Sequence, residues 1–203
     1  MIYELRTYRL VPRSVPEVER LFGEAYEHRK KYSELTAFWH TEIGPLNEIV
    51  HVWAYNDLAE RTRTRVEAAK DAHWPPKIRE YIVSMRSEIV VPFPFLPQVR
   101  PGKIGPVFEL RYYTLKLGAM PQVRNWEAAL SARLKLSPLV IAGAVEFGQA
   151  DGFIHVWAYE NLDQRMKVRA EAIAAGIWPP AGGEDLLTQE NKILLPAAFS
   201  PLS

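Results

Sequence analysis

The string HVWAY occurs twice in this chain, at residues 51–55 and again at residues 155–159. The two copies are 104 residues apart, since 155 − 51 = 104, and the same shift aligns many other residues in the same order. The aligned pairs include Glu42 with Glu146, Gly44 with Gly148, Arg61 with Arg165, Arg65 with Arg169, and Trp74-Pro75-Pro76 with Trp178-Pro179-Pro180. So many matches in one order indicate the tandem duplication of a single module.

A second block of similarity shows where each module begins. The run YELRTY at residues 3–8 matches FELRYY at residues 108–113, so one residue has been lost between the two blocks in the second copy. Prolines between the copies exclude a continuous helix or central strand there, and they are Pro92, Pro94, Pro97 and Pro101. We therefore divide the chain into a first module (1–96), a proline-rich linker (97–105) and a second module (106–203).

Both modules are predicted to contain the same series of elements. The first strand shows alternating polar and apolar residues, and Ser14 with Glu17 has the spacing of a capping box at the start of a helix. In the first module the predicted elements are a strand at 2–10, a helix from Ser14, hairpin strands at 37–43 and 48–55, a helix from Asp57 and a strand at 89–91. This order, βαββαβ, is that of ferredoxin-like folds.

A ferredoxin-like module leaves one face of its sheet uncovered by helices. The second module is the natural cover for the first, because an exposed apolar or aromatic sheet face is costly in water. We therefore predict an α+β protein in which two tandem ferredoxin-like modules pack sheet to sheet, as an intramolecular dimeric α+β barrel.

The composition is that of an ordinary soluble globular protein. Hydrophobic residues make up 48% and charged residues 24% of the chain, the net charge is +1, and cysteine is absent. We expect no nucleic-acid partner, no membrane insertion and a cytoplasmic location. A further association between two chains is left open.

The motifs quoted above, with the run FWHTEIGPLN at residues 38–47, resemble the NIPSNAP family. The second module lacks the matching run and has Ala142-Gly143-Ala144-Val145 there instead. The resemblance covers nearly the whole chain, twice, and implies a dimeric α+β barrel. It implies no defined reaction, since the family has no agreed enzymatic activity.

Strand alternation assigns side chains to the two faces of each sheet. Small apolar residues, Val50, Val52 and Ala54, are expected beneath the helices. The polar and aromatic set would then face the partner sheet and line a cavity between the modules. The predicted ligand-binding residues are Arg6, Tyr8, Trp53, Arg111, Tyr113, Glu146, His155 and Trp157. The structural alternative is an interdomain core, in which Glu4 and Arg6 bond within the sheet or across to Arg111 and Glu109.

Differences between the copies indicate where function has become asymmetric. Phe38 and His40 correspond to Ala142 and Ala144, a change that would free volume beside the second module. We therefore predict one asymmetric pocket, with His40, Glu42 and His51 as acid–base candidates. A rival location lies between helices and sheet, where Arg61 and Arg65 would reach an anion.

Absent motifs exclude several kinds of chemistry. HExxH, phosphate-binding-loop, GxGxxG and GxSxG patterns are missing, so we expect no metal and no cofactor. Two functions stay open. The first is a small-molecule-binding or interaction module without catalysis. The second is a cofactor-independent monooxygenase or isomerase acting on a small aromatic or oxo compound.

Overall fold

The computed structural model describes residues 1–119 and 123–203 of the chain. The first module consists of β1 (Ile2–Leu10), α1 (Val15–Arg29), β2 (Leu35–Ile43), β3 (Glu48–Tyr55), α2 (Leu58–Ala68) and β4 (Ile82–Pro92). The second module repeats this order with β5 (Val107–Leu115), α3 (Val123–Arg133), β6 (Leu139–Phe147), β7 (Gly152–Tyr159), α4 (Leu162–Ala174) and β8 (Leu186–Pro196). A short 3₁₀ helix precedes the last strand of each module, at Arg79–Tyr81 and Gly183–Asp185.

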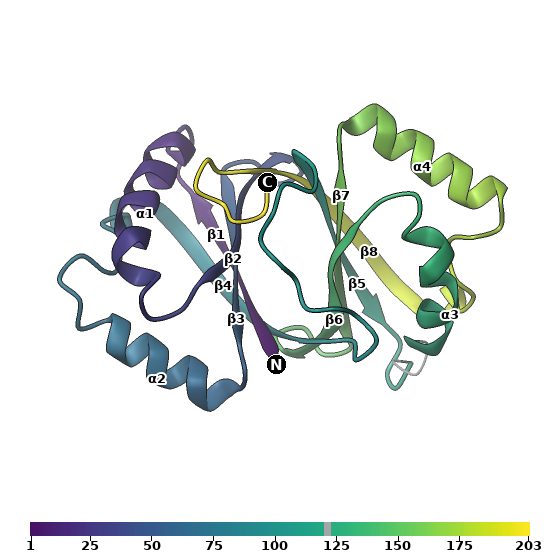
Figure 1. Cartoon of the computed structure of the whole chain (residues 1–203), viewed down its shortest axis with the longest axis horizontal. Coiled ribbons are helices and arrows are strands. Elements are labelled where there is room, and N and C mark those ends of the chain that lie inside the picture. Colours follow the sequence, from purple (N-terminus) through teal and green to yellow (C-terminus); the bar gives the residue numbers. More distant parts are fainter. Residues whose placement is uncertain (120–122) are drawn as a thin grey trace.

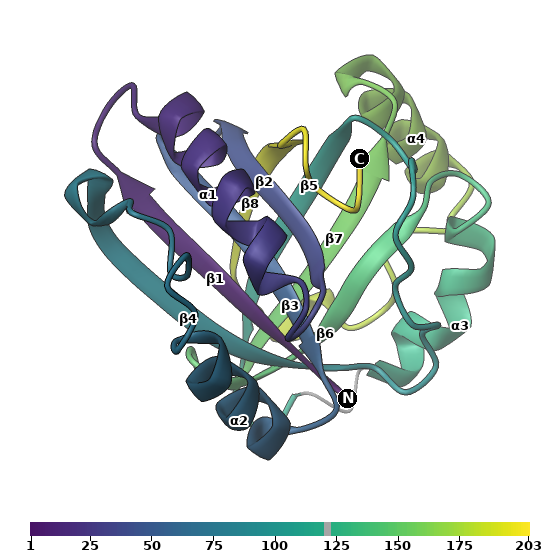
Figure 2. The ribbon, with the colours of Figure 1, turned by 60° about the vertical axis from the view of Figure 1, so that its left-hand side comes forward.

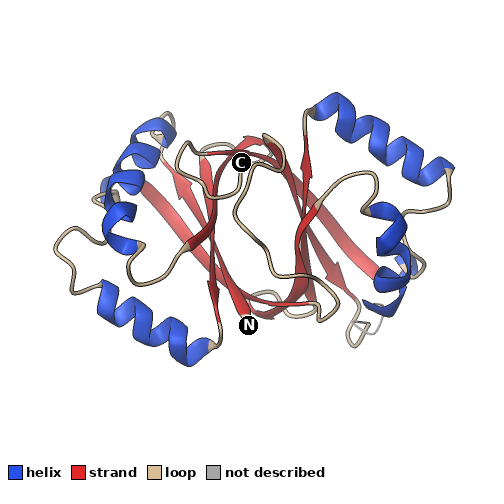
Figure 3. Ribbon diagram, viewed as in Figure 1, coloured by secondary structure: helices blue, strands red, loops and turns tan. Residues whose placement is uncertain are grey.

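The eight strands close into a single antiparallel barrel in the order β1-β3-β2-β8-β5-β7-β6-β4. The modules are joined at two seams, because β2 pairs with β8 and β4 pairs with β6. Figures 1 and 3 show the ring of strands in the centre and the helices of each module outside it, on opposite sides. The predicted α+β fold, two ferredoxin-like modules closed as a dimeric α+β barrel, is confirmed.

The barrel interior is packed with apolar side chains from both modules. Tyr3, Leu5 and Val52 of the first module meet Phe108 and Leu110 of the second in one buried cluster. Interiors of eight-stranded barrels are just wide enough to be filled in this way. Gly143 permits the close pairing of β6 with β4, since a Cβ atom at that position would collide with the backbone of Val91.

The face assignment made from the sequence is wrong. Val50 and Val52 point into the barrel, whereas Tyr8, Trp53 and Tyr55 belong to a separate cluster beneath the helices of the first module. The physical reason is charge. Two of the arginines beside Glu4, Arg61 and Arg65, come from α2, so this polar set faces the helices.

Helix α2 begins where the sequence predicts, whereas α1 begins without the predicted capping box. Asp57 caps α2, because its side chain accepts a hydrogen bond from Glu60 N. Ser14 does not form the predicted capping box, since its hydroxyl donates to Val11 O and Glu17 pairs with Arg20. The last strand of each module is longer than predicted. Its first half is exposed and has no apolar pattern, so the sequence gives no signal for a strand there.

The segment that follows the last strand of each module packs on the other module. After β4, Phe93 packs on the second module, and after β8, Ala197 and Phe199 pack on the first. Figure 2 shows α1 lying across the outer side of the first module's strands, with α2 below it. No helix within the described residues is long and apolar enough to cross a membrane.

Candidate functional site

A buried carboxylate holds helix α2 against the sheet of the first module. Glu4 on β1 is fully buried and accepts hydrogen bonds from Arg6 Nη1 at 2.7 Å, Arg61 Nη2 at 2.6 Å and Ser87 Oγ at 2.9 Å. Arg65 lies 3.4 Å from the same oxygen. Burial alone would raise the pKa of Glu4, but the hydrogen bond from Arg61 and the charge of Arg6 lower it to about 2. The anion that Arg61 and Arg65 reach is therefore part of the protein.

The second module repeats this arrangement. Glu109 accepts hydrogen bonds from Arg111 at 2.9 Å, Arg165 at 2.5 Å and Asn191 at 3.0 Å. Burial opposes ionisation here too, but the hydrogen bond from Arg165 and the charge of Arg111 lower the pKa of Glu109. Each network lies entirely within its own module. Glu4 therefore does not bond to Arg111 across the modules, which was the alternative.

A buried histidine stands beside each carboxylate network. Trp53 Nε1 donates to His51 Nδ1 at 2.7 Å, and Trp157 Nε1 donates to His155 Nδ1 at the same distance. Because Nδ1 accepts, the neutral ring carries its proton on Nε2. Burial, and then the charge of Arg6, lowers the pKa of His51 well below its ordinary value. The Nε2 atoms of both rings are buried and have no hydrogen-bond partner in the described part of the chain.

Arg29, at the end of α1, is a cation that sequence reasoning missed. It is 2% exposed, donates to Ser33 Oγ at 2.7 Å and to Tyr55 Oη at 3.2 Å, and lies 4.6 Å from the Trp53 ring centroid. Among the residues that the structure describes, no carboxylate forms an ion pair with it. Burial lowers the pKa of Arg29 accordingly. Its repetition as Arg133, at a shift of 104, was the signal that could have revealed it.

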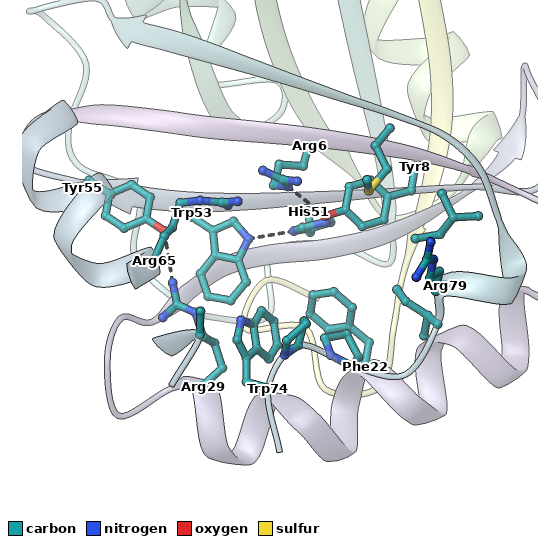
Figure 4. Close-up of a pocket in the computed structure, with 16 residues that line it drawn as sticks. Arg6, Tyr8, Phe22, Arg29, His51, Trp53, Tyr55, Arg65, Trp74 and Arg79 are labelled. Atoms are coloured by element: carbon teal, nitrogen blue, oxygen red, sulfur yellow. Dashed lines mark hydrogen bonds between the residues drawn. The ribbon is translucent and has the colours of Figure 1, made fainter. Parts of the chain in front are cut away.

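Arg6, Arg29, His51 and Arg65 line one continuous pocket between the sheet and the helices of the first module. Its volume is about 600 Å³. In Figure 4, Arg29, Tyr55 and Arg65 lie at one end, and Tyr8 and Arg79 lie at the other. Aromatic and apolar side chains form most of the remaining wall, and they include Phe22, Trp74, Ile78, Ile82 and Met85. The wall thus combines fixed cations with a large apolar surface.

In the second module the same space is divided into two chambers of about 320 and 220 Å³. Trp126 replaces Phe22, and its ring centroid lies 4.6 Å from that of Trp178. The corresponding pair, Phe22 and Trp74, is 5.4 Å apart. The larger indole occupies space beside the Trp-Pro-Pro turn. It lines the apolar chamber, and Trp178 lines both chambers.

The predicted free volume beside Ala142 does not exist. Phe93 N donates to Ala142 O, and the Phe93 ring packs 5.3 Å from that of Phe153. Phe153 stacks on His155 at 4.9 Å, where Phe38 stacks on His51 in the first module at 5.6 Å. A phenylalanine on the neighbouring strand thus replaces the one lost from β6, and the larger pocket lies in the first module instead.

The acid–base candidates are not brought together. His40 Nδ1 lies 2.7 Å from Glu19 Oε1, which raises the pKa of His40, and His40 does not line the pocket. Glu42 and Glu146 are exposed near the hairpin ends of β2 and β6. His51 alone of the three lines the pocket.

The predicted ligand-binding residues, Glu146 apart, do line the outer pockets, although on the opposite face from the one predicted. Arg6, Tyr8 and Trp53 line the first-module pocket. In the second module, Tyr113 lines the apolar chamber, and Arg111, His155 and Trp157 line the polar one. Over residues 1–119 and 123–203, no three histidine, aspartate or glutamate side chains gather as a metal site.

Comparison with solved structures shows which fold this is. A candidate monooxygenase from Fusobacterium nucleatum has the same fold, with a TM-score of 0.69 over 97% of this chain and 92% of that chain, at 10% identity. At that identity the similarity concerns the fold alone. A NIPSNAP family protein of unknown function from Agrobacterium tumefaciens is 38% identical, and covers 48% of this chain and 92% of its own (TM-score 0.46).

Sequence comparison shows the family. The human protein NipSnap homolog 3A is 28% identical over 215 residues, which span 100% of this chain and 86% of that protein. The family model described as NIPSNAP matches residues 3–97 and, separately, residues 108–201. This chain therefore belongs to the NIPSNAP family, and it carries two NIPSNAP segments in tandem.

Proposed function

We propose that the first module binds a small organic anion in the pocket between its sheet and its helices. The observation that carries this proposal is the single chamber of about 600 Å³, against the divided space at the matching place in the second module. That volume lies within the range typical of small-molecule sites.

The charges of the wall favour an anion. Arg6, Arg29, Arg65 and Arg79 line the pocket, and no acidic residue lines it in the described part of the chain. Glu4 balances Arg6 and Arg61, but Arg29 is buried against hydroxyl groups and indole rings without a carboxylate. A buried charge is costly unless it is paired, so a carboxylate, sulfonate or phosphate group on the ligand would lower that cost.

The apolar part of the wall favours an aromatic or aliphatic body on the same ligand. Phe22, Trp53 and Trp74 offer ring faces and edges, and Ile78, Ile82 and Met85 lie towards the end near Tyr8. Such a wall binds flat apolar groups by burial of surface, while the arginines orient the charged end.

Binding is favoured over catalysis because the acid–base cluster that motivated an oxygenase or isomerase does not assemble. His40 is paired with Glu19 outside the pocket, and Glu42 is exposed. His51 keeps Nδ1 occupied by Trp53, and its lowered pKa makes it a poor proton carrier near neutral pH.

The proposal is tested by titrating the protein with 8-anilinonaphthalene-1-sulfonate, an aromatic sulfonate, and measuring the heat of binding by isothermal calorimetry. Phe22→Trp introduces the residue of the second module and should weaken binding about tenfold or more, because the larger indole takes up space in the chamber. Phe147→Trp places the same side chain on an exposed hairpin and should leave the affinity unchanged.

A neutral probe separates charge from apolar burial. N-phenyl-1-naphthylamine lacks the sulfonate and should bind about tenfold more weakly than the anionic probe. Equal affinity for the two probes would show that the negative charge does not contribute to binding, and would contradict the proposed preference for an anion. Unchanged binding of the sulfonate by Phe22→Trp would place the probe outside this pocket.

A further inference from the structure

The second module contains a polar chamber that the proposed function does not use. It has a volume of about 220 Å³, and Arg111, Arg133, Arg169, His155 and Gln189 are among the residues that line it. We propose that this chamber is a binding site for a compact oxyanion with the size and charge of phosphate or sulfate. The proposal does not depend on ligand binding by the first module.

The chamber has more positive charge than its own acid balances. Glu109 is the one acidic residue in the chamber's described lining, and it is bonded to Arg111 and Arg165. Arg133 is 2% exposed, and its partners are the neutral Ser137 Oγ at 2.8 Å and Tyr159 Oη at 3.2 Å. Arg169 forms no ion pair with any residue that the structure describes. Two guanidinium groups therefore face the chamber without a counterion.

A neutral donor supplements these cations. His155 is 1% exposed, and its Nδ1 accepts the hydrogen bond from Trp157, so its proton is on Nε2. That atom is buried and lacks a partner among the described residues. A buried donor without an acceptor is rare and costs free energy, and His155 is among the residues that line the chamber.

The size of the chamber selects a compact ion. Trp178, which lines this chamber, packs at 4.6 Å from Trp126, and Ile173 stands where the first module has Ala69. The chamber has only about a third of the first-module pocket's volume, so it favours a smaller ligand than that pocket does. A tetrahedral oxyanion is such a ligand, and arginine suits its geometry because the guanidinium donates paired hydrogen bonds.

The matching end of the first module is a weaker site for such an ion. Arg65 there lies 3.4 Å from Glu4, whereas Arg169 has no ion pair with Glu109 in the described structure. The first-module pocket is also one large chamber, so water screens a small ion more strongly. A compact ion should therefore prefer the second module, and an amphipathic anion the first.

Isothermal titration with inorganic phosphate, in a buffer without other oxyanions, tests this assignment. We expect one saturable site, weakened about tenfold or more in Arg169→Gln, where a charge-assisted hydrogen bond is lost. Arg169 is half-buried and unpaired in the described structure, so this variant should fold. Arg65→Gln, the matched change in the first module, should bind phosphate as the parent chain does.

Other results would overturn the assignment. They are no saturable binding of phosphate, binding that Arg169→Gln leaves unchanged, or binding lost equally in Arg65→Gln. The two proposals are also separable, because the aromatic sulfonate reports on the first module and phosphate on the second. If the parent chain binds phosphate but not the sulfonate, the proposed function is contradicted and the oxyanion site is supported.

Discussion

The outer pockets of the two modules have similar polar ends and different apolar walls. Glu4, Arg29 and His51 are buried like Glu109, Arg133 and His155 and have matching main partners, but in the described structure only Glu4 has a second arginine of the helix, Arg65, within ion-pair distance. The apolar walls have changed, with Phe22 replaced by Trp126 and Ala69 by Ile173. The duplicated chain has thus kept a cationic chamber twice and an apolar extension joined to it once.

Compensation within the sheet also distinguishes the modules. The first carries Phe38 on β2 and Ile49 on β3, while the second carries Ala142 on β6 and Phe153 on β7. These positions are neighbours across the strand pair, so one aromatic ring stays against the buried histidine in both. A residue difference between copies therefore indicates a cavity only after its neighbours are counted.

The largest effect is expected at the feature that the modules share. Glu4→Gln removes the charge that Arg6 and Arg61 bond, and should lower the free energy of unfolding by about 3–5 kcal/mol, because it leaves buried cations unpaired. Urea denaturation measures this loss. Glu109→Gln should cost a similar amount, and Ser87→Ala, which removes one hydrogen bond to Glu4, about 1 kcal/mol. Equal small losses in all three variants would contradict the carboxylate networks described.

The next effect concerns the exchanged aromatic residues. Phe38 is fully buried between Phe22, His51 and Phe199, so Phe38→Ala should lower the free energy of unfolding by about 3–5 kcal/mol. The reciprocal change, Ala142→Phe, should cost about 1–3 kcal/mol, because Phe93 and Phe153 already fill the space. Chemical denaturation of both variants provides the test. A stabilising Ala142→Phe would reveal a void that the structure lacks.

A smaller effect is expected in the pH dependence of stability. His51 and His155 have folded pKa values below the ordinary 6.5, so the unfolded chain binds protons that the folded chain does not. Stability is unaffected above that pH and falls below it, by about 1.4 kcal/mol per pH unit for each histidine. His51→Gln keeps an acceptor for Trp53 and should reduce the slope between about pH 5 and 6.5 by one such increment.

His155→Gln is the matched variant and should reduce the slope equally. His40 acts in the opposite direction, since its raised pKa favours the folded chain at acidic pH, but its partial exposure keeps that contribution small. An unchanged slope in the double variant His51→Gln/His155→Gln would mean that both rings titrate normally.

The fold could be predicted because the duplication repeats the same strand and helix pattern in both modules. The repeated strings placed the modules, and the strand and helix signals of residues 2–55 gave the order of elements. The first halves of β4 and β8 were missed because their side chains are exposed. The face assignment was wrong because strand alternation separates two faces without showing which one the helices cover. The arginines of α2 that lie beside Glu4 decide this, and they are 57 and 61 residues away from it in the chain.

The sequence grouped several residues that line one pocket, but it put that pocket on the wrong face of the sheet. Arg6, Tyr8, His51 and Trp53 share a pocket, as expected, yet it lies under the helices. Arg29 was missed because an arginine in the last turn of a helix is ordinarily a surface residue. The role of Trp126 depends on a contact with Trp178 across 52 residues of chain, since 178 − 126 = 52, and no local pattern indicates such a contact.

In the proposed function, the aromatic wall decides which module binds an amphipathic anion. The double variant Trp126→Phe/Ile173→Ala gives the second module both residues of the first, and calorimetric titration with 8-anilinonaphthalene-1-sulfonate measures the stoichiometry. We expect one bound probe per parent chain and two per variant chain. A variant that still binds one probe, while remaining folded, would contradict the claim.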